Sequence, residues 1–291
     1  MLNKRLALSL NSMKFVFFGT PRLAAAVLDR LIERGAVPEA LVTNPDAPAG
    51  RKKIMTSPET KAVLQKKDVD IPVLQPEKID DEFLKKLKDI GADIFIVAAY
   101  KKMLPNALLD IPKHGVINIH PSLLPKYRGA SPVPTAIING ESETGVTLFK
   151  IDDQMDHGPI LMSEKVLINP EDNTPSMFEK MAIDSADMIV DNLFPNINNL
   201  PLVPQNEDEA TYAKKFATSD GFIEYSDLKK AESSDSELAK IIDRKIRALY
   251  PEPGCWTMEN DIRVKLLDSE IKNGLLRLKI IQKEGKKPVV V

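Results

Sequence analysis

Apolar runs of strand length alternate with helical patterns through the first part of the chain. The apolar run 14–18 stops at Gly19-Thr20-Pro21, and apolar positions at helical spacing follow it until Gly35. Other runs of strand type lie at 40–43, 73–74, 93–99 and 115–120, and other helical patterns at 59–67 and 80–89. Strands that alternate with helices favour parallel pairing, so the pattern predicts an α/β fold with a Rossmann-like, mostly parallel sheet.

The pattern changes after a loop at 121–134. Strand-like alternation at 145–151 and 160–168 brackets a turn-rich segment, and a helical pattern covers 176–193. Residues 196–211 have the proline, asparagine and acidic content of a linker, and a helix at 238–249 then precedes strand-like runs. We therefore expect a second, small β-rich unit. The predicted boundaries are 1–12 for a leader, 13–195 for the first domain, 196–211 for the linker and 212–291 for the second domain.

The first twelve residues resemble a targeting signal only in part. Lys4 and Arg5 precede an apolar stretch that is shorter than a signal peptide needs, and Met13 stands directly before the first strand pattern. We expect residues 1–12 to be a disordered leader. No segment approaches the roughly 18 apolar residues that span a bilayer, so we expect no membrane association.

Composition and charge exclude several classes of protein and site. With 43% hydrophobic residues in 291, the chain can bury a sizeable core. Its 40 basic and 42 acidic residues exclude a histone-like coat, although a local basic patch remains open. One cysteine, Cys255, excludes an internal disulfide framework and a multi-cysteine zinc site, and three histidines argue against a His-rich metal cage. We expect a cytoplasmic protein that needs no metal.

Candidate chemistry gathers at the end of the predicted strand 115–120. Asn118 and His120 project from the same face of that strand, because strand side chains alternate, and they lie where parallel sheets place their ligand crevice. A lone histidine in this position is more often structural than catalytic. The asparagine beside it adds an amide donor to a proton acceptor. Acyl transfer needs both, a base for the attacking amine and a donor for the developing oxyanion.

Asp156 is the third candidate, in the turn between the two later strands. A carboxylate near His120 would favour the protonated imidazole and help to hold its orientation. An aspartate shortly before a glycine is also common in plain turns, so both interpretations stay open. His114 and His157 have no comparable context, and we expect them to be surface or turn residues. The turn at Gly19 could hold an anion at a helix start, or be a turn and nothing more.

The pattern of these residues along the chain resembles that of the folate-dependent formyltransferases. The resemblance rests on the Asn118 and His120 pair, the SLLP run at 122–125, Arg128-Gly129, and Asp156 placed 36 residues after the histidine. It begins at the strand and turn FFGTP and covers almost everything from Met13 onward. Further matching stretches are NPDAPAGR at 44–51, Leu74-Gln75-Pro76, Ala99-Tyr100, YPEPGCW at 250–256 and GKKP at 285–288. The loop at 44–51 and the second unit point to the branch that acts on charged tRNA.

The resemblance implies a fold, a reaction and a set of site residues. It implies a formyltransferase domain that binds 10-formyltetrahydrofolate, followed by an OB-like β-barrel domain that contacts tRNA. The formyl group would pass to the α-amino group of methionine on initiator methionyl-tRNA, without a metal and without an obligate protein partner, in a monomer. Three groups of residues match the family: the catalytic trio Asn118, His120 and Asp156; the folate-contacting Ser122, Leu123, Leu124, Pro125 and Tyr100; and Arg51, Lys52 and Lys53, in the loop 44–58 that approaches the acceptor stem.

Two features depart from the family pattern. Family members usually carry a basic residue at the position of Ala47, and the loop is shorter by a residue around 51–54. This bears on how the acceptor stem is recognised. The sequence printed here also stops at KKPVVV, where the family usually continues, so we expect a smaller contribution of the second domain to tRNA affinity.

Three rival functions remain from the sequence. A formyltransferase that acts on a small amine, such as glycinamide ribonucleotide or an amino sugar, would share the trio but would not need residues 211–291 or the basic loop. A non-catalytic tRNA-binding protein would not need the trio. A nicotinamide dehydrogenase is disfavoured because the glycine fingerprint is missing. Cys255, beside Trp256, is expected to be a buried structural thiol.

Overall fold

The computed structural model describes residues 13–49 and 53–291, which form two compact units. The predicted leader 1–12 and the loop residues Arg51 and Lys52 lie outside the described part of the chain. The first unit contains Met1–Lys126, Gly145–Lys165 and Phe178–Ala210, and the second contains Tyr127–Thr144, Val166–Met177 and Thr211–Val291. The second unit thus takes two segments from within 13–195, the range that the sequence predicts as one domain.

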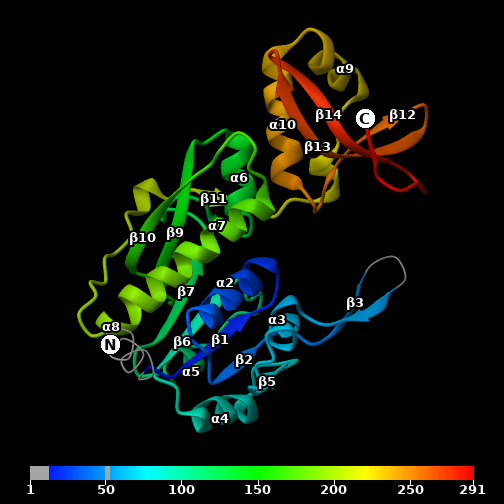
Figure 1. Cartoon of the computed structure of the whole chain (residues 1–291). Helices are drawn as coiled ribbons and strands as arrows, with labels where there is room; N and C mark the ends of the chain where they lie inside the picture. The colour runs from blue at the N-terminus through cyan, green and yellow to red at the C-terminus, as the bar shows by residue number, and fades with distance from the viewer. Residues whose placement is uncertain (1–12, 50–52) are drawn as a thin grey trace, which may run out of the picture. The chain divides into compact units, whose positions relative to one another are not determined.

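A seven-stranded sheet forms the centre of the first unit (Figure 1). Its strand order is β10-β9-β7-β6-β1-β2-β5. The strands are β1 (Phe15–Gly19), β2 (Ala40–Val42), β5 (Val73–Leu74), β6 (Ile94–Ala98), β7 (Val116–His120), β9 (Glu143–Lys150) and β10 (Ile160–Leu167). The five strands from β7 to β5 pair in parallel, and β9 runs antiparallel to β7. The predicted mostly parallel α/β sheet is confirmed.

The central strands are buried on both faces because helices cover the sheet on its two sides. Every residue of β1 and of β6 is buried. Such strands have continuous apolar sequences, FVFFG and IFIVA, instead of alternating ones. The result is a rigid platform from which β7 presents its last residues.

The helices of this part of the chain are α2 (Arg22–Glu33), α3 (Glu59–Lys67), α4 (Asp81–Ile90), α5 (Asn106–Leu109), α6 (Pro132–Asn139), α7 (Thr174–Asp187), the π-helical turn Met188–Leu193 and α8 (Phe194–Asn196). Three of them, α2, α3 and α4, lie where the helical spacing predicts them, whereas α5 and α6 are not predicted from the sequence. Asp80 caps α4 by accepting a hydrogen bond from the Phe83 amide at 3.0 Å. The single helix predicted at 176–193 instead changes to π-helical geometry after Asp187.

The predicted loop 44–58 contains a short antiparallel hairpin. Strand β3 (Ala47–Ala49) pairs with β4 (Ile54–Thr56), and Figure 1 shows the hairpin projecting from the first unit. The sequence gives no strand signal here, because each strand has three residues and β3 contains Pro48.

The second unit combines an antiparallel sheet with two helices. Strands β12 (Cys255–Glu259), β13 (Ile262–Lys272), β14 (Leu275–Lys283) and β15 (Val289–Val290) follow one another in the sheet, and α9 (Tyr225–Ser233) and α10 (Ser236–Leu249) pack on it. The helix α6 joins this core through the partly buried Ile138, which explains why its segment belongs to the second unit. Strand β11 (Tyr212–Ala213) pairs in parallel with β8 (Arg128–Gly129).

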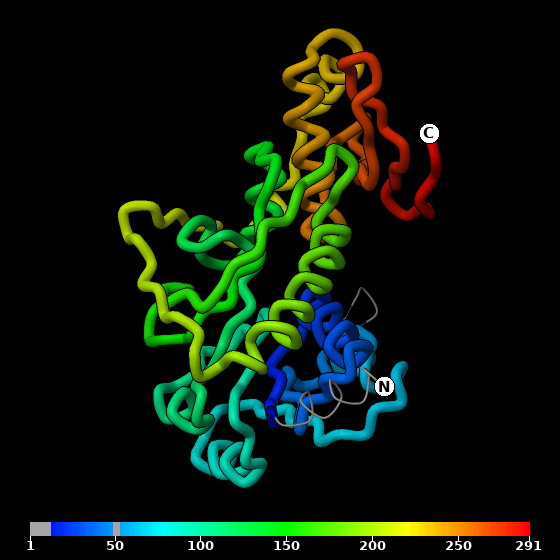
Figure 2. Tube along the Cα trace, turned by 60° about the vertical axis from the view of Figure 1, so that its left-hand side comes forward, coloured from blue at the N-terminus to red at the C-terminus, as the bar shows by residue number. Residues whose placement is uncertain are grey.

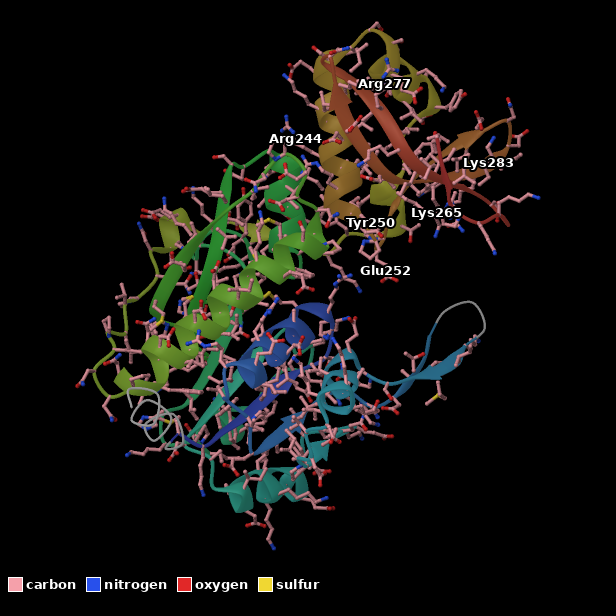
Figure 3. All side chains as sticks on the ribbon, in the orientation of Figure 1. Arg244, Tyr250, Glu252, Lys265, Arg277 and Lys283 are labelled. Atoms are coloured by element: carbon pink, nitrogen blue, oxygen red, sulfur yellow. The ribbon has the colours of Figure 1, made fainter. Side chains whose placement is uncertain are left out.

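The two long strands of this second sheet carry exposed basic side chains. Figure 3 labels Lys265, Arg277 and Lys283, which come from β13 and β14. Lys265 and Arg277 are exposed, and Lys283 pairs with Glu259 at 2.9 Å. The small β-rich module expected after residue 211 is confirmed as a four-stranded antiparallel sheet.

Every helix in 13–49 and 53–291 is too short or too polar to cross a lipid bilayer. Within the same ranges, no three side chains of His, Cys, Asp or Glu come together as metal ligands would.

Candidate active site

His120 is the last residue of β7 and is almost completely buried. Its side chain is 4% exposed, and its ring meets the edge of Phe149 with 6.4 Å between the ring centroids. Asn118, two residues earlier, is half-buried, whereas Ile117 and Ile119 are buried. The alternation along a strand places Asn118 and His120 on the same face. A base and an amide therefore share one face at the end of a rigid strand.

Asp156 reaches this strand end from the turn between β9 and β10. Its carboxylate Oδ1 lies 3.7 Å from Nδ1 of His120, and its side chain is 16% exposed. The pairing holds a carboxylate and an imidazole together in a poorly solvated place, where electrostatic interactions are stronger than in water. Such a pair can accept a proton from an attacking amine and return it to a leaving group.

The turn that carries Asp156 has a tightly determined backbone. Asp156 itself adopts the left-handed region, with φ of 50°. A Cβ atom on Gly158 would lie 1.9 Å from the carbonyl oxygen of Lys150, so only glycine allows the turn to pack against the end of β9. His157 bonds within the same turn, with Nδ1 at 2.6 Å from Oδ2 of Asp152.

The SLLP run follows His120 directly and is shaped by Thr147 of β9. The Thr147 hydroxyl donates to the carbonyl oxygen of Ser122 at 2.7 Å and accepts from the amide of Leu124 at 3.1 Å. Ser122 is fully buried and its own hydroxyl donates to the Lys126 carbonyl at 2.6 Å. Leu123 and Pro125 are half-buried. The run therefore presents two partly exposed apolar side chains beside His120.

Tyr100 follows β6 and carries a hydroxyl that lacks a hydrogen-bond partner among the described residues. Its ring meets Phe18 edge-on, with 5.6 Å between centroids. Burial raises the pKa of Tyr100 to about 12, so the hydroxyl stays protonated at neutral pH. The Tyr100 hydroxyl is therefore a buried, protonated donor without a hydrogen-bond partner among the described residues.

The tip of the basic loop is described only in part. Lys53 is exposed and has φ of 48°, whereas the predicted contacts Arg51 and Lys52 lie outside the described residues. On β4, Ile54 and Met55 are 62% and 63% exposed. The hairpin thus presents apolar and basic side chains to solvent.

The base of this hairpin is fixed by the carboxylate of Asp46. It accepts hydrogen bonds from Gln75 at 2.8 Å, from Lys61 at 3.1 Å to each oxygen, and from Ser57 at 3.2 Å. These donors lower the pKa of Asp46, with the Gln75 amide as the largest cause and Lys61 next. Asp46 and Ser57 flank the two strands of the hairpin, so their hydrogen bond closes its base.

Sequence reasoning missed two residues that shape the site, Thr147 and Gln205. Thr147 lies in an apolar strand pattern and gives no local signal. Gln205 lies in the segment predicted as a linker, and its amide bonds to the Asp156 turn. Neither contact could be found without the fold, because the partners are 23 or more residues apart in the chain.

Comparisons with known proteins match two successive parts of the chain to two domain families. The sequence profile of the family described as formyl transferase matches residues 13–193, and the profile described as formyl transferase, C-terminal domain, matches 236–275. A protein of Thermodesulfovibrio yellowstonii named methionyl-tRNA formyltransferase is 39% identical, with 95% of this chain and 93% of that protein covered. A protein of the same name from Halalkalibacterium halodurans is 41% identical, over 87% of this chain and 77% of the relative.

A solved structure has the same fold. The methionyl-tRNA formyltransferase of Clostridium thermocellum superposes with a TM-score of 0.60 at 16% identity, over 93% of this chain and 98% of that one. The family profiles cover both units, and the two relatives match most of the chain. The protein therefore belongs to the methionyl-tRNA formyltransferase family.

Proposed function

We propose that this chain transfers the formyl group of 10-formyltetrahydrofolate to the α-amino group of methionine on initiator tRNA. The product is formylmethionyl-tRNA for the initiation of translation. The observation that carries the proposal is the buried pair at the end of β7, with 3.7 Å between Nδ1 of His120 and Oδ1 of Asp156. Membership in the family and the similarity to named relatives support the same reaction.

The reaction exchanges one carbon–nitrogen bond for another. The free α-amine attacks the formyl carbon, a bond forms between them, and the carbonyl oxygen gains negative charge. The bond from that carbon to N10 of the folate then breaks, and the proton that the amine loses ends on N10. An α-amine with a pKa of about 8 is partly unprotonated at neutral pH, so a modest base is sufficient.

The three polar residues have separate parts in this proposal. The Asn118 amide, and His120 once it has taken the proton of the attacking amine, donate to the developing oxyanion, which a preorganised donor stabilises more strongly than water does. Asp156 holds His120, or an ordered water that carries the proton to the folate nitrogen. The left-handed turn at Asp156 and the rigid strand β7 fix the two partners before the substrate arrives.

The formyl donor is placed beside the SLLP run in this proposal. Leu123 and Pro125 offer apolar surface, and the Tyr100 hydroxyl offers a hydrogen bond that no described residue takes. Residues present in the chain therefore suit a ligand with a flat apolar ring and polar edges. The reaction needs no metal in this scheme, because the proton moves through His120, Asp156 and water.

The tRNA is expected to meet two basic regions, one in each unit. In the first unit it is the hairpin with Lys53, together with Arg51 and Lys52 of the same loop. In the second unit it is the two long strands of the sheet, where Lys265 and Arg277 are exposed. Contacts of this kind hold the phosphate backbone and weaken with salt. We expect the protein to act as a monomer in the cytoplasm, where charged tRNA is available.

The decisive experiment is formyl transfer from 10-formyltetrahydrofolate to charged initiator tRNA, with the His120→Ala variant beside the wild type. Rapid formylation that falls by about 10²- to 10⁴-fold in the variant supports the proposal, since that is the usual contribution of a general acid or base. Release of tetrahydrofolate with small amines and without transfer to tRNA would assign the chain to the small-molecule branch. Tight tRNA binding without folate turnover would contradict any enzymatic role.

A further inference from the structure

The segment after α8 returns along the turn that carries Asp156. Val203 and Ile160 exchange both backbone hydrogen bonds, at 2.8 and 2.9 Å, as an antiparallel bridge. Figure 2 traces this part of the chain in yellow-green and yellow. Although the sequence predicts a linker at 196–211, Val203 is thus bonded to the first residue of the edge strand β10 within the first unit.

Gln205 is the inward-pointing residue of this segment. In the described run 201–209, the side chain of Gln205 is half-buried and the other eight residues are exposed. An amide in such a place needs partners, because a buried polar group without them destabilises the fold. The hydrogen-bond partners of the Gln205 amide therefore indicate its role.

The side-chain amide of Gln205 holds both ends of the Asp156 turn. Its Nε2 donates to the carbonyl oxygen of Asp156 at 2.9 Å and to that of Gly158 at 2.8 Å. An amide nitrogen has two hydrogens, and each has a partner here. Beside it, Oε1 of Glu207 lies 3.5 Å from Nε2 of His157, the residue between the two carbonyls.

The turn conformation depends on such support. Asp156 has φ of 50°, a region that residues other than glycine adopt infrequently, and a Cβ atom on Gly158 would collide with the Lys150 carbonyl oxygen. Conformations of this kind persist when surrounding contacts fix them. One of the two carbonyls that Gln205 captures belongs to Asp156 itself, and the other belongs to Gly158, two residues later in the same turn.

We propose that Gln205 is a positioning residue for formyl transfer, acting through the main chain of Asp156 and Gly158 to hold the Asp156 carboxylate beside His120. This inference rests on the proposed role of the His120–Asp156 pair. Gln205 does not touch the reacting atoms in this proposal. It fixes the distance of 3.7 Å between the two groups that do.

The chain offers variants that isolate this contact. Gln205→Met keeps the length of the side chain and removes both hydrogens, and Gln205→Glu replaces them with a charge that carbonyl oxygens repel. The matched control is Gln282→Met in the second unit, where the amide also donates to a main-chain carbonyl, that of Lys286 at 2.8 Å. Thermal unfolding of each variant identifies those that fold. If Gln205→Met does not fold, Gln205→Asn keeps the amide and shortens its reach.

The kinetic test uses the full chain with 10-formyltetrahydrofolate and methionyl-tRNA. We expect Gln205→Met to lower kcat by about 10- to 100-fold, because a catalytic group displaced by about 1 Å loses up to that factor. KM for both substrates should stay within about twofold, and Gln282→Met should leave kcat within about twofold. Combined with Asp156→Asn, the Gln205 change should cost nothing further, because both act through one interaction. Multiplicative losses, or an unchanged kcat, would overturn the inference.

A test without substrate separates this inference from the proposed function. The chain has three histidines, so their imidazole signals can be resolved and assigned by NMR with His120→Ala. The His120 signal should move in Gln205→Met and in Asp156→Asn, and stay in place in Gln282→Met. If the signal moves as expected but the wild type formylates no methionyl-tRNA, the proposed function fails and the positioning stands. A His120 signal that is the same in Gln205→Met as in the wild type would contradict the positioning role of Gln205.

Discussion

Two aspartates of the first unit show opposite ways of using a carboxylate. Asp156 is held through its main chain, by the Gln205 amide on its carbonyl oxygen, and its carboxylate faces His120. Asp46 is held through its carboxylate, which accepts hydrogen bonds from Gln75, Lys61 and Ser57. One side chain points at a base and the other closes a hairpin.

The comparison shows that the atom by which a residue is anchored indicates its role. The Asp46 carboxylate accepts hydrogen bonds from three side chains, which stabilise its charged form and lower its pKa. A carboxylate whose backbone does the anchoring can keep its oxygens turned towards a reacting group. The following predictions separate the two cases, beginning with the largest effect.

Asp156→Asn should abolish most of the rate and leave the fold intact. Asparagine tolerates the left-handed conformation with φ near 50°, so the turn can keep its shape while the charge is lost. We expect kcat to fall by about 10²- to 10³-fold, within the range for general acid–base groups, in a steady-state formylation assay. Asp152→Asn, which removes the carboxylate bonded to His157, is the matched control and should retain kcat within about threefold.

Asp46→Asn should change substrate affinity and leave the chemical step intact. The variant loses the charge that Lys61 pairs with, so the base of the hairpin is held less firmly. Because this ion pair is partly exposed and screened by solvent, its loss should have a small effect, and KM for methionyl-tRNA should rise by about three- to fivefold at constant kcat. The measurement is the dependence of the rate on tRNA concentration. A fall in kcat without a change in KM would show that Asp46, like Asp156, affects the chemical step.

Tyr100→Phe should stabilise the free protein and weaken its hold on the formyl donor. Its buried hydroxyl has no partner among the residues described, so removing it should raise the free energy of unfolding by about 1 kcal/mol. If the formyl donor accepts a hydrogen bond from that hydroxyl in the wild type, KM for the formyl donor should rise by about threefold in the variant. Urea unfolding and donor titration measure the two effects. Lower stability of the variant would show that the hydroxyl is already bonded.

The pH dependence of stability should reveal the anchoring at Asp46. Its pKa in the folded chain is lowered below the unfolded value of about 3.9 by the Gln75, Lys61 and Ser57 donors. The stabilising contribution is therefore present above about pH 4 and is lost as the pH falls through the folded pKa. The difference in urea midpoint between wild type and Asp46→Asn should be constant near neutral pH and shrink in acid. A difference that grows in acid would contradict this assignment.

The sequence predicts the layout of the sheet and the trio better than the contacts that support them. Strands β1 and β6 are evident because buried parallel strands have unbroken apolar runs, and the shared face of Asn118 and His120 follows from strand alternation. Asp156 can be proposed from its turn and from the family resemblance. Its distance from His120 depends on how the turn folds back, which no local pattern encodes.

The missed features are of two kinds. The hairpin β3–β4 is missed because three-residue strands have no measurable period, and α6 because its prolines are typical of a loop. Gln205 is missed because its segment has a polar, proline-containing composition, and its contacts bridge 47 and 49 residues. The grouping of 127–144 with the second unit likewise depends on packing between α6 and α10.

Trp256 is the single tryptophan of the chain, and its place in β12 gives the protein an internal optical reporter. The indole lies 4.7 Å from the Phe222 ring and 4.1 Å from the Arg263 guanidinium, and its Nε1 donates to the Thr218 carbonyl. All four residues belong to the second unit. Tryptophan fluorescence therefore follows the melting of that unit alone, while circular dichroism follows both. Two curves that fail to coincide would show that the units unfold as separate cooperative bodies.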